Sequence, residues 1–348
     1  MSAEASIPRP NAREAGAHAG RGKSSEVRWW TRALAALASL KLTLAVIIAF
    51  ALALTMVYLL NVESSWPIAV PLAAFAVNLA AAVATNGVFR RQTALLVFHL
   101  SLIAIVLLIA AGRLTYLRGE AEVSVGAAFD GRLSSAQAGP LHPGHFSKVS
   151  FVNEGYAIEY SPGMKRDDTR NAVSWMDGEQ RRQAVIGDQE PLVLRGYRFY
   201  TTHNKGFAPV FVWRTDAGSY RGTVHLPSYP GNAYSQAQQW TPPGAAVPVW
   251  IMLELEQPVF DERAAWTFRA PAEHKLIVRV GEERRELRPG DDYALPGGAL
   301  HYQGLTTWMG YSVFYDPTLP WLLASALLAV ASLAWHFWRK FAAQPWDA

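Results

Sequence analysis

The chain has 348 residues, 51% of them hydrophobic, and a formal net charge of +4 at neutral pH. It has no cysteine, which excludes disulfides in an exported domain and any chemistry that needs a thiol of this chain. Four apolar stretches are close to the roughly 20 residues that cross a bilayer, so the composition favours a multi-pass membrane protein over a soluble enzyme.

The N-terminal segment, residues 1–32, is rich in Ala, Gly, Ser and Arg, and we expect it to be a disordered basic tail. Residues 33–112 contain three predicted transmembrane helices, at 42–60, 66–85 and 93–112. Pro67 and Pro71 lie near the start of the second helix, where a missing backbone N–H costs little. A fourth transmembrane helix is predicted at 318–340, followed by a short tail at 341–348.

Basic residues indicate the orientation of these helices. They gather before the first helix, at Arg90 and Arg91 between the second and third, and at Arg339 and Lys340 after the fourth. The positive-inside rule therefore places both termini in the cytoplasm. Residues 113–317 then lie outside it, on the periplasmic side of a cytoplasmic (inner) membrane. This segment has 21 basic and 23 acidic residues, so the basic excess of the chain reflects topology and predicts no nucleic-acid partner.

Residues 113–317 carry the pattern of a β-rich domain. Short runs of β-branched and aromatic residues alternate with turn dipeptides such as Pro162-Gly163, Asp177-Gly178 and Pro296-Gly297. The pattern predicts an antiparallel sandwich or open barrel, with a long loop or flap at 226–249. The candidate strands are 121–125, 148–152, 156–160, 192–195, 198–202, 210–213, 250–255 and 276–280. The predicted fold class is therefore α plus β: four transmembrane helices with a large exported antiparallel domain between the third and fourth.

The third predicted helix contains a histidine, His99, within an otherwise apolar run. A polar imidazole in a membrane helix calls for a functional explanation, and neutral imidazole is a common ligand of haem iron. The helical rise of about 1.5 Å per residue places His99 about 9 Å inside Thr93, in the cytoplasmic half of the bilayer. The alternative is a histidine that only hydrogen-bonds a neighbouring helix.

Four segments resemble the ResB family of cytochrome c biogenesis proteins. They are the entry to the first helix at 37–42 (LASLKL), the third helix and following strand at 98–122, the stretch at 191–200 (PLVLRGYRFY), and the closing strand and last helix at 302–322. The external domain is shorter than in many members, and residues 226–249 match nothing in the family pattern. The resemblance implies three membrane helices, an exported β domain and a final helix.

The resemblance also implies a function. Members help to deliver haem to exported apocytochrome c, together with a ResC/CcsA-type membrane partner that carries a tryptophan-rich haem-handling segment. His99 matches the family position that supplies one axial ligand to haem b, which would make it the metal ligand of this chain. The chain would then be one half of a haem lyase, without catalytic activity of its own.

Three further residues are candidates for the haem site. Asn78 is predicted to lie at a depth similar to that of His99, so its amide is a candidate hydrogen-bond partner of the imidazole, or else a generic interhelical contact. Arg113 and Arg118 follow the third helix and are candidates to contact haem propionates, with interfacial anchoring as the alternative. The remaining histidines have no zinc-ligand spacing.

Two other functions remain open from the sequence. The chain could be a membrane-tethered β-domain scaffold, or accessory subunit, of another exported complex that does not handle haem. It could also be a sensor, although residues 1–27 and 341–348 offer no cytoplasmic output domain. No phosphate-binding loop or nucleophile-elbow motif points to a hydrolase or transferase.

Overall fold

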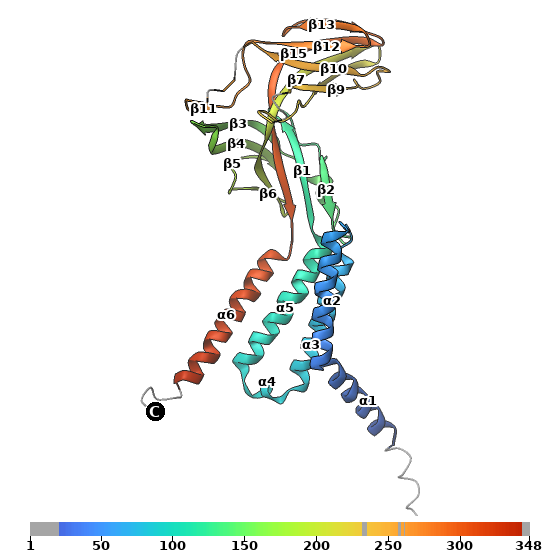
Figure 1. Cartoon of the computed structure of the whole chain (residues 1–348), viewed down its shortest axis with the longest axis vertical. Coiled ribbons are helices and arrows are strands. Elements are labelled where there is room, and N and C mark those ends of the chain that lie inside the picture. The colour runs from blue at the N-terminus through green and yellow to red at the C-terminus, as the bar shows by residue number, and fades with distance from the viewer. Residues whose placement is uncertain (1–20, 232–234, 257–258, 261, 343–348) are drawn as a thin grey trace, which may run out of the picture. The chain divides into compact units, whose positions relative to one another are not determined.

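The computed structural model describes residues 21–231, 235–256, 259–260 and 262–342. The chain forms two compact units, one made of Met1–Leu114 with Pro317–Ala348 and the other of Thr115–Asp316. The first unit is helical and the second is built almost entirely of strands (Figure 1).

Helices make up the first unit. Its described residues contain four helices that are long and apolar enough to cross a membrane: α2, α3, α5 and α6. Pro67 lies at the N-terminal end of α3, as expected from the sequence, whereas Pro71 lies inside the helix. The short helix α4 joins α3 to α5. The bounds are α1 Arg21–Leu37, α2 Leu40–Leu59, α3 Trp66–Thr85, α4 Gly87–Arg91, α5 Thr93–Thr115 and α6 Leu319–Ala342.

Helix α1 differs from the expectation of a disordered tail at 1–32. Residues 1–20 lie outside the described residues, but the chain is helical from Arg21 to Leu37. No proline occurs between these two residues, and the segment is rich in Arg, Ala and Leu, which are strong helix formers. A segment that is too polar to cross a membrane can therefore still form a helix.

Small and aliphatic side chains hold the helices of this unit together. Ile68 and Leu72 of α3 contact Ala110 of α5, and Phe50 and Val57 of α2 pack against the same cluster. Close packing through small residues is typical of helices in lipid, where no hydrophobic effect drives association. This packing fixes α5, the helix that carries His99.

The second unit contains three antiparallel sheets. The largest has the strand order β2-β1-β15-β7-β6, with β14 also paired to β15 and β8 to β7. Two four-stranded sheets have the orders β13-β12-β10-β9 and β11-β3-β4-β5. The strands are β1 Leu117–Ser124, β2 Ser135–Ala138, β3 Val152–Ser161, β4 Lys165–Asp177, β5 Gln180–Ile186, β6 Leu192–Leu194, β7 Tyr197–Thr215, β8 Gly218–Thr223, β9 Ala237–Trp240, β10 Val249–Leu255, β11 Trp266–Thr267, β12 His274–Val280, β13 Glu283–Leu287, β14 Asp292–Leu295 and β15 Gly298–Tyr315.

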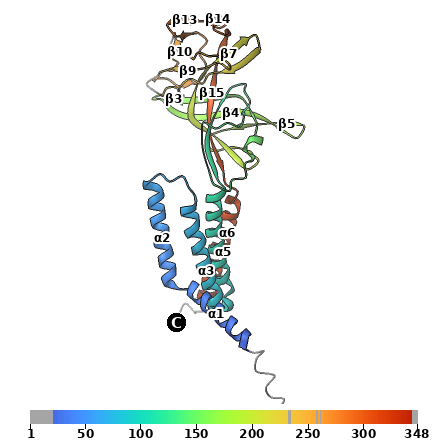
Figure 2. The same ribbon diagram turned by 90° about the vertical axis from the view of Figure 1, so that its right-hand side faces the viewer.

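Two long strands organise this unit. β7 and β15 have 19 and 18 residues and pair along most of their length, with register shifts between Tyr302 and Gly304 and between Met309 and Tyr311. They run past both smaller sheets (Figures 1 and 2). Aromatic rings from all three sheets fill a core without disulfides. The largest fully buried side chains include Trp213, Trp308, Tyr197, Tyr302, Tyr311, Phe199, Phe207 and Phe268.

Three details of the predicted strands are wrong. Residues 148–152 are not a strand, because a 3₁₀ helix at His145–Lys148 places Phe146 in the core and β3 begins at Val152. The sequence Asn153-Glu154-Gly155 also predicts a turn between two strands, but these residues form a bulge inside β3, where the buried Asn153 amide donates to the Val123 carbonyl. The predicted loop at 226–249 contains β9, which pairs with β10.

Candidate functional site

His99 lies on α5 with its imidazole half-buried and its hydrogen bonding defined. Nδ1 lies 2.8 Å from the carbonyl oxygen of Leu95, one turn earlier. A carbonyl can only accept, so Nδ1 carries the proton and the neutral ring keeps a lone pair on Nε2. Within the described part of the chain, Nε2 has no hydrogen-bond partner. This is the tautomer that a metal-binding histidine uses, with a backbone carbonyl fixing the other nitrogen.

Two aromatic rings restrict the orientation of this imidazole. The Phe89 ring centroid lies 4.6 Å from that of His99, and the Phe98 ring meets it edge-on at 5.3 Å. Phe89 belongs to α4, whose first turn is capped by the Asn86 side chain accepting from the amide of Val88 at 3.0 Å. The short helix between α3 and α5 therefore positions one wall of the histidine site, which the sequence did not reveal.

Asn78 does not serve as the hydrogen-bond partner of His99. It is 2% exposed, its Oδ1 accepts from the Thr43 hydroxyl at 2.7 Å, and its Nδ2 donates to the Leu37 carbonyl at 2.5 Å. A longer contact of 3.4 Å joins Nδ2 to the Ser39 carbonyl. The sequence predicts the depth of Asn78 but not the direction in which it faces. Its amide ties α3 to the junction between α1 and α2.

Arg113 lies on the same helix as His99, whereas Arg118 lies in the other unit. Arg113 is half-buried in the last turn of α5, 14 residues beyond His99, which is about 21 Å along a helix. Arg118 is exposed on β1, in the second unit. Arg90 and Arg91, both exposed, directly follow Phe89.

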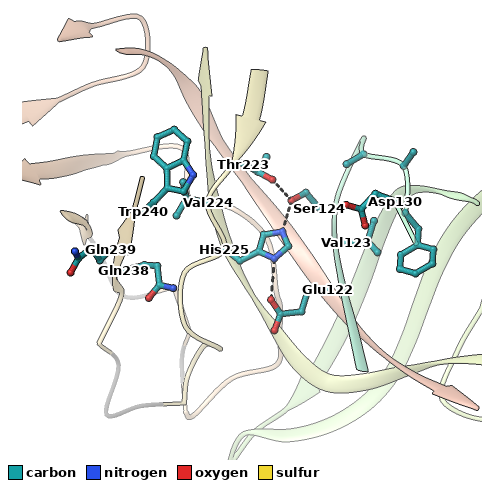
Figure 3. Close-up of a pocket in the computed structure, with 13 residues that line it drawn as sticks. Glu122, Val123, Ser124, Asp130, Thr223, Val224, His225, Gln238, Gln239 and Trp240 are labelled. Carbon is teal, nitrogen blue, oxygen red and sulfur yellow. Dashed lines mark hydrogen bonds and ion pairs between the residues drawn. The ribbon is translucent and has the colours of Figure 1, made fainter. Parts of the chain in front are cut away.

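A second polar cluster lies in the β unit, and the sequence did not indicate it. His225 Nδ1 lies 3.0 Å from Glu122 Oε2, and His225 Nε2 lies 2.9 Å from Ser124 Oγ (Figure 3). Ser124 Oγ is also 2.8 Å from Thr223 Oγ1. These side chains line a cavity of about 430 Å³ that is closed on another side by Trp240.

The order Ser–His–Glu resembles the proton relay of acyl-transfer enzymes, but the environment of the serine does not suit that chemistry. Ser124 is only 2% exposed, and its hydroxyl is shared between His225 and Thr223. The His225 ring also stacks on Trp308 at 5.4 Å. The cluster therefore fastens β1 to the segment that leaves β8. No group of three or more metal-ligating His, Asp or Glu side chains occurs among the described residues.

The chain combines four helices that are long and apolar enough to cross a membrane with a large antiparallel β unit, and one of these helices carries His99. The chain belongs to the ResB-like family, whose pattern it matches over residues 74–340. The match confirms the resemblance found in the sequence and implies a role in cytochrome c biogenesis. It includes His99, the whole β unit and most of α6. No match was found among curated proteins.

Proposed function

We propose that this protein is the membrane subunit of a cytochrome c haem lyase that binds haem b through His99 and helps to pass it to exported apocytochrome c. The observation that carries the proposal is the free Nε2 of His99, in a ring whose Nδ1 is already held by the Leu95 carbonyl. Haem is the cargo, and its iron and vinyl groups supply the chemistry by which the cysteine thiols of the apocytochrome are joined to it.

One histidine fills one axial position, so a second subunit has to complete the site. A ResC/CcsA-type membrane protein is the partner that family membership suggests. The exposed surface of this chain leaves room for such a partner and for the lipid bilayer. Within the described residues, α2 has no buried side chain, and large apolar residues such as Leu52, Trp321 and Leu327 are more than 60% exposed.

Arg90 and Arg91 are the cations that we assign to the propionates of this haem. They follow Phe89, whose ring contacts His99, and both are exposed. The Arg90 guanidinium also donates to the Ala84 carbonyl at 3.4 Å. Guanidinium groups bind carboxylates through two parallel hydrogen bonds. Because Arg90 and Arg91 directly follow Phe89, they would hold the propionate edge of a porphyrin bound at His99.

The proposed orientation follows from the same basic residues. With Arg90, Arg91, Arg339 and Lys340 in the cytoplasm, both termini are cytoplasmic and Thr115–Asp316 lies in the periplasm. His99 would then take up haem from the inner half of the cytoplasmic membrane. The β unit would act where exported apocytochrome is present.

The test is spectroscopic. The full chain is co-expressed with its tryptophan-rich multi-span partner, the complex is purified in lipid nanodiscs, and the Soret absorbance per complex is measured. We expect His99→Ala to reduce the haem content of the complex at least about tenfold. His336→Ala is the matched control, because it removes a half-buried histidine from another apolar helix, α6.

Equal haem content in the wild-type complex and in His99→Ala would refute His99 as the ligand. A colourless wild-type complex, with both subunits present in equal amounts, would refute haem binding itself. That second result would favour the membrane-tethered scaffold. Assembly of each variant complex is checked by its elution volume, so that a loss of haem is not mistaken for a loss of partner.

A further inference from the structure

One lysine of the β unit is buried with no counter-ion among the described residues. Lys205 lies on β7 and is 3% exposed. Its Nζ lies 5.2 Å from the ring centroid of Tyr160 and 5.4 Å from that of Phe268. Among the described residues, no carboxylate and no other hydrogen-bond acceptor contacts this ammonium group. Buried charges are normally paired, so an unpaired one is unusual.

Lys205 lines a cavity of about 330 Å³. The other walls are Tyr160, Met164, Arg166, His203 and the segment 228–231. This segment is anchored to the lysine backbone, because the Ser228 hydroxyl and the Tyr229 amide both donate to the Lys205 carbonyl, at 3.1 and 2.9 Å. The cavity therefore combines aromatic and apolar walls with basic and neutral polar groups, and no carboxylate is among the residues that line it.

The second cation of the cavity is already neutralised. Arg166 forms an ion pair with Asp188 at 2.6 Å and donates to the Thr202 carbonyl at 2.9 Å. Its remaining contacts go to the Thr169 hydroxyl. Arg166 thus has its donors engaged, whereas the ammonium of Lys205 has ring faces beside it and no hydrogen-bond acceptor within the described part of the chain. Counting the described residues, one positive charge in the cavity, that of Lys205, is left uncompensated.

Burial lowers the pKa of Lys205 from its usual value of 10.5 to about 8, and the nearby Arg166 charge adds to this effect. A group with this pKa is still mostly protonated at neutral pH. An anion entering the cavity would recover solvation that the ammonium group has lost. The ring faces of Tyr160 and Phe268 offset that loss only in part.

We propose that this cavity is a binding site for a single carboxylate group carried on an apolar ligand, with the carboxylate paired to Lys205. One uncompensated positive charge matches a carboxylate, which is a monoanion, better than a phosphate monoester, which carries nearly two negative charges. Tyr160, Met164 and Pro230 supply the apolar surface for the remainder of the ligand. The proposal does not depend on haem binding by His99.

The carboxylate could belong to a small aliphatic acid or to a porphyrin propionate, and two probes distinguish these sources. Binding of hexanoate, and of metal-free mesoporphyrin, is measured by titration of the full chain in nanodiscs at pH 7. Hexanamide and mesoporphyrin dimethyl ester are the uncharged counterparts. The metal-free porphyrin has no iron for His99, so failure of the haem proposal leaves this experiment unaffected.

We expect saturable binding of at least one acid but not of its uncharged counterpart. Lys205→Met should weaken that binding about tenfold or more, since an ion-paired hydrogen bond is lost. Lys165→Met, which removes an exposed lysine of β4, should leave it within about twofold. Hexanoate-only binding assigns the site to small acids, whereas mesoporphyrin binding that the ester lacks assigns it to propionates.

A second measurement covers the case in which Lys205→Met does not fold. The thermal midpoint of the wild-type β unit within the full chain should rise with the acid that binds and stay constant with its uncharged counterpart. The proposal is overturned if neither acid binds saturably, or if folded Lys205→Met binds the acids as well as the wild type does.

Discussion

Replacing Lys205 with methionine should stabilise the protein at neutral pH in the absence of ligand. Methionine has a similar length and no charge, so it keeps the contacts with Tyr160 and Phe268 without the desolvated ammonium group. A structural lysine would behave in the opposite way, because its removal would cost stability. The sign of the stability change therefore distinguishes a ligand-binding role of Lys205 from a structural role.

The size of the effect follows from the pKa of Lys205. Lowering it from 10.5 to about 8 corresponds to about 3 kcal/mol against the folded state when the lysine is protonated. The loss of the cation–π contacts in Lys205→Met destabilises the folded state by about 1 kcal/mol, which offsets part of this gain. The net gain of about 2 kcal/mol should raise the thermal midpoint by about 5 °C for a unit of this size.

The gain should vanish at high pH. Between pH 8 and pH 10.5 the unfolded chain keeps the proton on Lys205 while the folded chain has released it. The unfolded state then binds more protons, so wild-type stability rises with pH across this window. Lys205→Met lacks this rise. Tyr160, Arg166 and His203 line the same cavity, and Asp188 pairs with Arg166. All four are unchanged in both proteins, so their titration largely cancels in the difference.

The assay is thermal unfolding of the full chain in nanodiscs between pH 7 and pH 10, followed by near-ultraviolet circular dichroism. Lys165→Met serves as the control for loss of a lysine charge at an exposed position. A Lys205→Met protein that is less stable than the wild type at pH 7 would refute the reasoning. A stability difference that stays constant from pH 7 to pH 10 would also refute it.

Three further outcomes are expected. Asn78→Ala should destabilise the helical unit by about 1 kcal/mol, because the bonds to Thr43 and the α1–α2 junction are lost, yet leave the haem content of the complex unchanged. Burial lowers the pKa of His274, so wild-type stability should fall as the pH drops below 6.5, where the unfolded chain takes up the proton first. His274→Gln should make this fall smaller. Urea unfolding of both proteins measures it. Gly298→Ala should cost about 1–3 kcal/mol, whereas Gly222→Ala, where a Cβ meets open space, should cost little.

Each of these outcomes has a result that would contradict it. Haem loss in a correctly assembled Asn78→Ala complex would return Asn78 to the haem site. An unchanged acid dependence in His274→Gln would show that burial of the His274 imidazole does not govern the acid transition. Equal stability of the two glycine variants would mean that the strand carrying Gly298 can move away from the Trp213 ring, which lies 2.9 Å from the added Cβ position.

Helices and turns were largely predictable because their signals are local. A membrane helix needs only an apolar run of sufficient length, and α2, α3, α5 and α6 each contain one. Glycines in the predicted turns adopt positive φ angles, as at Gly163, Gly178 and Gly297, where φ is 83°, 63° and 89°. These features depend on neighbouring residues, so one sequence is enough to find them.

Strand length and pairing were less predictable. β7 runs from Tyr197 to Thr215, although the sequence indicates two short strands at 198–202 and 210–213. β4 begins with charged and polar residues and was not expected at all. Both strands are completed by hydrogen bonds to partners far along the chain, β15 in one case and β3 and β5 in the other.

The same contrast between local and tertiary information applies to the sites around His99 and Lys205. The sequence alone determined that His99 is a lone imidazole in an apolar helix, because one polar residue in such a run is conspicuous. The folded structure was needed to show that Leu95 fixes its tautomer, that Asn78 faces α1 and α2 instead, and that Lys205 is buried with no counter-ion among the described residues. Hydropathy is a property of each residue in order, whereas burial and pairing depend on which distant residues the fold brings into contact.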